Sequence, residues 1–393
     1  MLLGVVSMLT DISSEAVSAV LPIYLTSVVG LAPLAYGLVD GIFHGASALV
    51  RVLGGWIADR GDHPKWVAVF GYGVSALTRL AIIPMQGLVS ITMVISVDRL
   101  GKGVRTAPRD ALIAASSPRE SLGRAFGVHR ALDTTGALIG PLLAFLILLA
   151  VPGGYRAVFL VSFAAAAVGL AVLLLFVPDL RPRRAMARGP AEMTSPSLRL
   201  LGERRFGGLV AATALVGVVT VGDGFLYLSL LEQESIRAVH FPLLFVGSSI
   251  AYLALAVPLG RLSDRIGRAR VFVAGHLALL GAYLCAGGLV EGAAIGISCL
   301  LLLGTYYAAT DGVLAALTGN VVHPSVRASG IATAQTMIAT ARFMASLGFG
   351  TLWTLIGLSS AMMAVAVGLV VVLPIAWLLL RHAETDLTSP APV

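Results

Sequence analysis

Charged residues are scarce in this chain of 393 residues. Asp, Glu, Lys and Arg make up 12% of it, the apolar set makes up 58%, and the mean hydropathy is +0.93. A soluble domain has about 25% charged and about 45–50% apolar residues. The shortage excludes a soluble enzyme and a disordered chain, and it indicates an all-α membrane protein with an apolar surface toward lipid.

Cysteine and lysine are rare as well. Cys285 and Cys299 are the chain's two cysteines, and they lie in apolar runs without a Cys-x-x-Cys motif. We therefore expect free thiols and neither a disulfide nor a metal site. Two lysines stand beside 25 arginines, mostly in short segments between apolar runs. There they are typical of topology signals, so the net charge of +7 does not indicate nucleic-acid binding.

Apolar runs of about 20 residues, the length that crosses a bilayer, recur along the chain. We expect twelve transmembrane helices, at 3–28, 34–58, 66–86, 89–110, 121–150, 155–177, 206–231, 241–262, 271–290, 293–317, 327–353 and 359–381. A basic, proline-containing segment lies between the sixth and the seventh. It divides the chain into an N-terminal six-helix bundle (1–178), a cytoplasmic linker (179–205) and a C-terminal six-helix bundle (206–393) with a short cytoplasmic tail.

Lys and Arg are distributed unevenly between alternate loops. With a cytoplasmic N-terminus, 17 of them fall on the inside, against Arg156 and Arg237 outside. Positive residues accumulate on the cytoplasmic side of membrane proteins. We therefore expect a multi-pass protein of the inner (plasma) membrane with both termini in the cytoplasm.

The two halves of the chain repeat each other. A glycine, an aspartate and an arginine follow the second helix, and a longer copy of the same pattern follows the eighth. The residues are Gly55, Asp59 and Arg60 in the first copy, and Gly260, Asp264, Arg265, Gly267 and Arg268 in the second. Parallel six-helix repeats are typical of transporters whose substrate site lies between the halves.

These loop residues resemble the major facilitator superfamily (MFS), and the resemblance covers essentially the whole chain. The family signature G-x-x-x-D-[RK]-x-G-[RK] is complete in the second copy, whereas Asp62 replaces a glycine in the first. The fourth helix resembles the family's R-x-x-Q-G element, with Lys102 in place of glutamine. In the fifth helix, Gly127, Gly136, Gly140 and Pro141 match G-x8-G-x3-G-P, an element typical of the family's antiporters, although its closing Gly-Gly pair is absent.

The resemblance implies two pseudo-symmetric six-helix bundles and a cavity lined by the first, fourth, seventh and tenth helices. Ionisable residues at bilayer depth are costly and therefore candidates for function. Those four helices carry Asp11, Glu15, Asp98, Arg99, Lys102, Asp223 and Asp311. Asp11 and Glu15 share one helix face, and two close carboxylates repel, so one of them is expected to hold a proton. The alternative is that they form ion pairs with Arg99 or Lys102 that only hold the bundle together.

Positive charge is concentrated on the fourth helix, where Asp98 and Lys102 are spaced for an ion pair. A surplus of cations suits an anionic or zwitterionic substrate. The alternative is that the lower cations are topology charges. Asp40 and His44, four residues apart, could bind a divalent metal together with the first-helix acids, but no His or Cys cluster supports such a site.

We expect a secondary active transporter that works by alternating access, is not an enzyme and uses no cofactor. The function that fits best is proton-coupled efflux of a small organic solute. The alternatives are a proton-coupled importer of a small anion, a divalent-metal exporter and a non-transporting membrane receptor on the same scaffold. Its partners are expected to be the substrate, protons and lipid, without nucleic acid, and the chain is expected to be a monomer.

Overall fold

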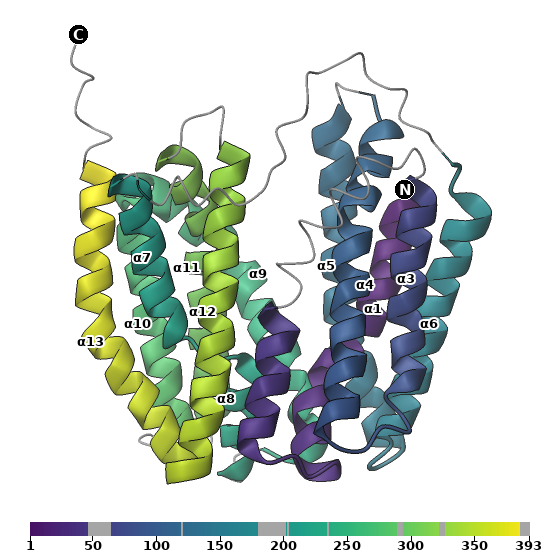
Figure 1. The fold of residues 1–393 in the computed structure, drawn as a ribbon, viewed down its shortest axis with the longest axis horizontal. Helices are drawn as coiled ribbons and strands as arrows, with labels where there is room; N and C mark the ends of the chain where they lie inside the picture. The colour runs from purple at the N-terminus through teal and green to yellow at the C-terminus, as the bar shows by residue number, and fades with distance from the viewer. Residues whose placement is uncertain are drawn as a thin grey trace. The chain divides into compact units, whose positions relative to one another are not determined.

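The structure is a computed structural model that describes residues 1–45, 64–118, 121–179, 202, 204–233, 236–288, 294–321 and 327–385 (Figure 1). Within these ranges every regular element is a helix, which confirms the predicted all-α class. The elements are α1 (Leu2–Ile23) with a π-helical end (Tyr24–Val28), a helix at 33–45, α3 (Pro64–Ala81), α4 (Leu88–Ala115), α5 (Leu122–Ala150), α6 (Tyr155–Phe176), α7 (Arg204–Val218), α8 (Asp223–Glu232), a 3-10 turn (Ala238–His240), α9 (Phe241–Ile266), α10 (Arg268–Ala286), α11 (Ile295–Val321), α12 (Arg327–Ile356) and α13 (Leu358–Thr385).

Seven helical segments of the described chain are long and apolar enough to cross a membrane. They are Leu2–Val28, Leu122–Ala150, Tyr155–Phe176, Arg205–Glu232, Ala238–Ile266, Arg268–Ala286 and Leu358–Arg381. The helix α4 has 28 residues, which is also sufficient for a span, but its mean hydropathy is reduced by the charges described below.

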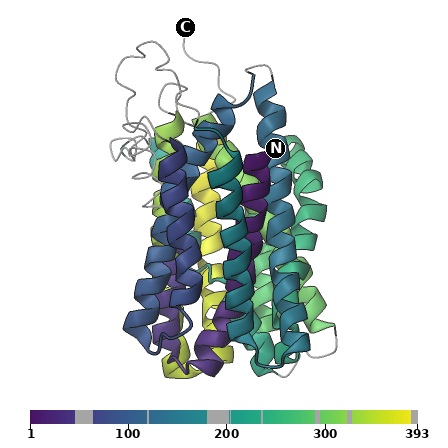
Figure 2. The same cartoon turned by 90° about the vertical axis from the view of Figure 1, so that its right-hand side faces the viewer.

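The chain forms two compact units. Unit 1 comprises Met1–Leu31, Ile42–Met193 and Ala238–Val246, and unit 2 comprises Ala32–Gly41, Thr194–Arg237 and Gly247–Val393. In unit 1, α1 packs on α5 and α6, and α3 packs on α4 and α6; in unit 2, α10 packs on α11 and α13, and α7 packs on α12 and α13. The helices of each unit run side by side (Figure 2). Most of the predicted linker at 179–205 lies outside the described residues, so its boundaries stay a prediction.

Close backbone contact joins α1 to α5. A Cβ atom at Gly136 would collide with the carbonyl oxygen of Met8, and one at Gly140 would lie 2.7 Å from that of Ile12. Gly127, the first glycine of the same motif, would meet nothing within 4 Å. Two of the motif's glycines therefore serve helix packing, since small residues let neighbouring backbones approach.

The prediction of one continuous seventh helix at 206–231 is wrong. The chain leaves the helix after Val218 and begins α8 at Asp223, with Gly222 in an extended conformation before it. The hydroxyl of Tyr283 on α10 accepts the N–H of Val221 at 2.8 Å and donates to the carbonyl of Val219 at 3.0 Å. The break persists because this hydroxyl satisfies backbone groups that the interrupted helix leaves without partners.

The beginning of the second helix belongs to unit 2, where it packs on α12. A Cβ atom at Gly37 would lie 2.5 Å from the carbonyl oxygen of Ser346 and 3.1 Å from Cα of Gly350. The Ser346 hydroxyl also donates a hydrogen bond of 2.7 Å to the Asp40 carboxylate. This helix crossing thus combines small residues with a buried polar contact.

Candidate functional site

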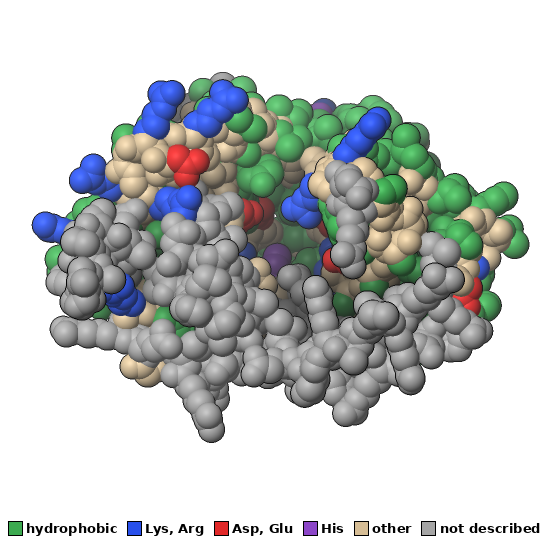
Figure 3. Space-filling model, turned by 90° about the horizontal axis from the view of Figure 1, so that it is seen from above, with side chains coloured by type: hydrophobic (Ala, Val, Ile, Leu, Met, Phe, Trp, Pro, Cys, Tyr) green, Lys and Arg blue, Asp and Glu red, His purple; other side chains and the backbone are tan. Residues whose placement is uncertain are grey.

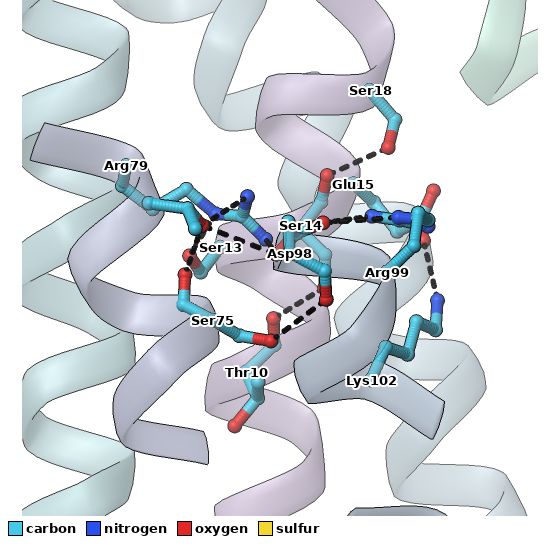
Figure 4. Close-up of polar contacts among 11 residues, drawn as sticks. Thr10, Ser13, Ser14, Glu15, Ser18, Ser75, Arg79, Asp98, Arg99 and Lys102 are labelled. Carbon is cyan, nitrogen blue, oxygen red and sulfur yellow. Dashed lines mark hydrogen bonds and ion pairs between the residues drawn. The ribbon is translucent and has the colours of Figure 1, made fainter. Parts of the chain in front are cut away.

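A cluster of buried charges in unit 1 surrounds Asp98 on α4 (Figure 4). Asp98 Oδ1 forms an ion pair with Arg79 of α3 at 3.0 Å. The other oxygen, Oδ2, pairs with the guanidinium group of Arg99. Thr78 adds a hydroxyl donor at 3.3 Å. Each of the three charged residues is at most 6% exposed. Two cations around one carboxylate leave this cluster with an excess positive charge.

Side chains of neighbouring helices cover the charge cluster around Asp98. Arg79 Nε donates to the Ser13 hydroxyl of α1 at 3.4 Å, and the Arg99 guanidinium lies over the ring of Phe43 at 3.9 Å. A cavity of about 10 Å³ beside them, lined among others by Ser14 and Ser18, has room for about one water molecule. Arg99 therefore lies in a packed polar core, and a substrate could reach it only if these helices moved.

Lys102 pairs with an acid of another helix and not with Asp98, which lies one turn before it on α4. Its ammonium group lies 3.9 Å from the carboxylate of Glu15 on α1 (Figure 4). The side chains are 36% and 32% exposed. The possible i, i+4 pair on α4 is therefore not formed, because Asp98 pairs with Arg79 of α3 and with Arg99. The expected alternative, an ion pair between a first-helix acid and Lys102, agrees with the structure at Glu15. Lys102 and Glu15 form an accessible, charge-balanced pair between α1 and α4.

Asp11 lies one turn before Glu15 and is half-buried. Its charge interacts with those of Lys102, Glu15 and Asp133, the last of which is on α5. Asp11 and Glu15 lie four residues apart on the continuous helix α1, so they share one face of it.

Two further cations lie on α4. Arg105 is 4% exposed, stacks on Tyr72 at 4.5 Å, and its Nη1 makes no hydrogen bond with any described residue. Arg109 pairs with Asp110 at 3.0 Å and donates to the hydroxyl of Ser7 at 3.3 Å. Both side chains therefore point into unit 1 and differ from ordinary surface topology charges.

The C-terminal candidates occur in unit 2. Asp223 is the first residue of α8 and accepts a hydrogen bond from the Tyr307 hydroxyl of α11. Asp311, an exposed residue of α11, interacts electrostatically with Arg342 of α12. Arg342 in turn donates to the hydroxyl of Tyr306 at 3.4 Å.

The loop motif is described in its second copy. Helix α9 ends at Ile266, Gly267 adopts φ +104°, and α10 begins at Arg268. Asp264 pairs with Arg268 at 3.2 Å, and its side chain is 66% exposed. Gly260 and Arg265 lie in the last turns of α9. Gly55, Asp59 and Arg60 lie outside the described residues. In the view along the helices, Lys and Arg side chains stand on the surface of the described chain (Figure 3).

A metal site has no geometric support in the part of the chain that the structure describes. No group of three or more His, Cys, Asp or Glu side chains there is arranged to hold an ion. Cys285 and Cys299 are free and buried.

The comparisons with known proteins agree with this architecture. Residues 3–238 match the family model described as Major Facilitator Superfamily. An uncharacterised MFS-type transporter of Methanocaldococcus jannaschii is 30% identical over 368 residues, which cover 90% of this chain and 87% of the relative. The chain belongs to the major facilitator superfamily. It is therefore a multi-pass membrane transporter and not an enzyme, as predicted.

Solved MFS structures share its fold. The crystal structure of the nucleoside transporter NupG superposes with a TM-score of 0.83 at 15% identity, over 97% of this chain and 98% of that one. A bacterial homologue of the human lysosomal transporter Spinster, in an inward-facing and occupied conformation, gives 0.77 at 16% identity over 99% and 98%. The predicted MFS fold is confirmed by these similarities.

Arg130 and Asp133, three residues apart on α5, form an ion pair at 3.8 Å, and the Arg130 side chain is 79% exposed. The contact of Arg79 with Asp98 joins α3 to α4, so no spacing along one helix indicates it. The sequence signal for such residues is an ionisable side chain in an apolar run. That signal identifies the residue but not its partner.

Proposed function

We propose that this MFS protein is a proton-coupled exporter of a small organic solute. The observation that carries the proposal is the Lys102–Glu15 pair at 3.9 Å, partly open to solvent and adjacent to Asp11. Protonation of either acid removes a negative charge next to Lys102 and changes the balance of that pair. A charge balance that depends on protonation can couple proton binding to the position of the α4 side chains.

Export by exchange is supported by the fifth-helix element with Gly136 and Gly140, which resembles the family's antiporter motif. In this chain both glycines bring α5 against α1, the helix that carries the proposed proton-binding acids. The proposed role of the motif in the mechanism is therefore to allow close packing of α5 against α1.

A second candidate function, import of a small anion with protons, is favoured by one observation. The buried cations Arg79, Arg99 and Arg105 outnumber the buried acid Asp98, and Arg105 Nη1 has no hydrogen-bond partner among the described residues. An uncompensated cation attracts a substrate of opposite charge.

The deciding experiment begins with ligand stabilisation. Purified protein is heated with panels of drugs, organic anions, sugars and divalent metal ions, and the compound that raises the melting temperature is then tested in proteoliposomes containing a pH-sensitive dye. Addition of an exported solute should drive proton movement in the opposite direction. Stabilisation by an organic anion together with proton movement in the same direction would favour the importer instead. Transport without any proton movement would overturn both.

We also propose that both termini are cytoplasmic in the inner membrane, in accord with the distribution of Lys and Arg. Single cysteines at Ser90 and Arg268, in a background without Cys285 and Cys299, test this orientation. A membrane-impermeant thiol reagent applied outside should label Ser90→Cys and leave Arg268→Cys unlabelled. The reverse pattern would invert the topology.

A further inference from the structure

Positive charge exceeds negative charge in the buried cluster around Asp98. Asp98 forms an ion pair with Arg79 of α3 at 3.0 Å and accepts a hydrogen bond of 3.0 Å from Nε of Arg99. All three side chains are buried. Asp98 is the one acid among the described residues that lies within ion-pair distance of either guanidinium group. One carboxylate therefore faces two cations, and the cluster keeps one positive charge in excess.

The neighbouring charges on α1 and α4 leave this excess in place. The carboxylate of Glu15 lies 3.9 Å from the ammonium group of Lys102, so it balances that cation. Arg105, a further buried cation of α4, stacks on Tyr72 and adds to the positive charge. Burial of an uncompensated charge is strongly unfavourable. A small anion bound beside the two guanidinium groups of the cluster would offset it.

A cavity with a suitable lining lies beside the cluster. Its volume is about 10 Å³, which corresponds to about one water molecule. Arg79 and Arg99 contribute to its wall, together with the hydroxyl residues Ser14 and Ser18 of α1 (Figure 4). Asp98 also lines it, but both carboxylate oxygens already pair with the arginines. The wall therefore offers guanidinium and hydroxyl donors to an ion and is otherwise largely apolar.

The hydroxyl groups of the cavity can turn toward an ion at little cost. The Ser14 hydroxyl donates to the carbonyl of Thr10 at 2.7 Å, and the Ser18 hydroxyl donates to that of Ser14 at 2.8 Å. Both carbonyls belong to the interior of α1, where each also accepts the backbone N–H four residues later. They stay satisfied when a hydroxyl rotates away, because the hydroxyl bond is additional to the helical one.

We propose that this cavity binds a halide ion, with chloride as the abundant member of that class, as a resident counter-ion of Arg79 and Arg99. Size selects the class, because a monatomic anion is only somewhat larger than a water molecule, whereas sulfate, phosphate and organic anions are much larger. The ion receives N–H groups from α3 and α4 and hydroxyl groups from α1, so it joins three helices of unit 1. It is a structural ligand, separate from the transported solute, and it requires no proton coupling.

Thermal unfolding of the purified full-length protein tests the site without any substrate. Potassium chloride replaces potassium gluconate stepwise at constant ionic strength, so that screening of surface charge stays the same. Chloride should raise the melting temperature by about 2 °C or more along a saturable curve, because a ligand that binds the folded state stabilises it. Bromide should have the same effect. A melting temperature that does not depend on the halide would overturn the site.

Ser18→Val tests the location of the site. It adds methyl groups to the cavity wall and removes a hydroxyl donor, so the halide-dependent shift should disappear. Ser90→Val is the matched control, because Ser90 lies in the first turn of α4 outside the cavity and its hydroxyl also donates to a carbonyl four residues earlier, at 3.0 Å. This variant should retain the full shift. An unchanged shift in Ser18→Val, or an equal loss in both variants, would contradict the location.

Crystals of the wild-type protein grown in bromide determine the position without any variant. Anomalous diffraction should place a bromide peak beside the guanidinium groups of Arg79 and Arg99, close to the Ser14 hydroxyl. The lack of a peak there, at a bromide concentration that saturates the thermal shift, would overturn the site. Proteoliposomes with the protein should take up chloride no faster than protein-free liposomes. Chloride uptake that Ser18→Val abolishes would make the halide a cargo and reject its resident role.

Discussion

The hydroxyl of Tyr283 stabilises the break in the seventh spanning segment, where it accepts a hydrogen bond of 2.8 Å from the N–H of Val221. The same hydroxyl donates a hydrogen bond to the carbonyl of Val219, so one side chain satisfies two backbone groups of the break. Tyr283 itself is fully buried. The position of Asp223 at the start of α8 therefore depends on a residue 62 positions away from the break.

Tyr283→Phe should lower the free energy of unfolding by about 1–3 kcal/mol, because it leaves the buried N–H of Val221 and the part-buried carbonyl of Val219 without this partner. Denaturant titration in detergent micelles measures this change. Tyr252→Phe is the matched control, since it removes the hydroxyl of a half-buried tyrosine on α9 and should have a much smaller effect. Equal losses in the two variants would contradict the bridging role.

Gly136→Ala should destabilise the protein by about 1–3 kcal/mol, the usual cost of overpacking a core. The added methyl group would collide with the backbone of Met8, which cannot move without displacing α1. Gly127→Ala is the control from the same motif, because a methyl group there meets nothing within 4 Å. Its expected effect is neutral or stabilising by up to about 1 kcal/mol, as alanine favours helix more than glycine. Thermal melting followed by light scattering and circular dichroism compares the two.

Asp98→Asn should destabilise unit 1 by about 3–5 kcal/mol, because the guanidinium groups of Arg79 and Arg99 would remain buried without a counter-ion. Asp264→Asn removes a carboxylate that is 66% exposed and should cost less than about 1 kcal/mol. The yield of monodisperse protein in size-exclusion chromatography and the unfolding midpoint give the comparison. A stable Asp98→Asn protein would show that the two arginines have another source of compensation.

Lys102→Gln should shift the pH midpoint of transport upward by about one unit or more, because loss of the ammonium group makes protonation of the nearby acids easier. Transport is measured against pH and against substrate concentration in proteoliposomes. Arg156→Gln removes an exposed cation at the start of α6 and should leave the pH profile in place. Weaker substrate affinity with an unchanged pH profile would instead assign Lys102 to an anionic substrate. No change in either property would make it structural.

Much of the fold follows from the lengths of the apolar runs. The predicted helices at 121–150 and 155–177 agree within one residue with α5 and α6, because bilayer thickness fixes the length and turn residues mark the ends. The break after Val218 had no comparable signal. It depends on Tyr283, which comes from α10 and is not adjacent in sequence.

The sequence identifies ionisable residues in apolar runs, such as Asp11, Glu15, Asp98 and Lys102, but it leaves their partners open. Of the partners considered for Lys102, the structure has Glu15. Spacing along one helix favoured Asp98 with Lys102, whereas the structure pairs Asp98 with Arg79 and Lys102 with Glu15. Which cation reaches a carboxylate depends on how α1, α3 and α4 pack together, and a periodic pattern within one helix contains no information about that packing.

The contact between Asp40 and Ser346 has a consequence for biosynthesis. The two residues are 306 positions apart, so the ribosome completes the first long before it begins the second. During that interval the polar Asp40 and the small-residue face at Gly37 have no α12 to cover them. The nascent second helix must therefore be sheltered by the insertion machinery or by earlier helices until the eleventh span emerges. Truncated chains that end before α12 should consequently be captured by membrane quality-control proteases, even though most of their helices are already inserted.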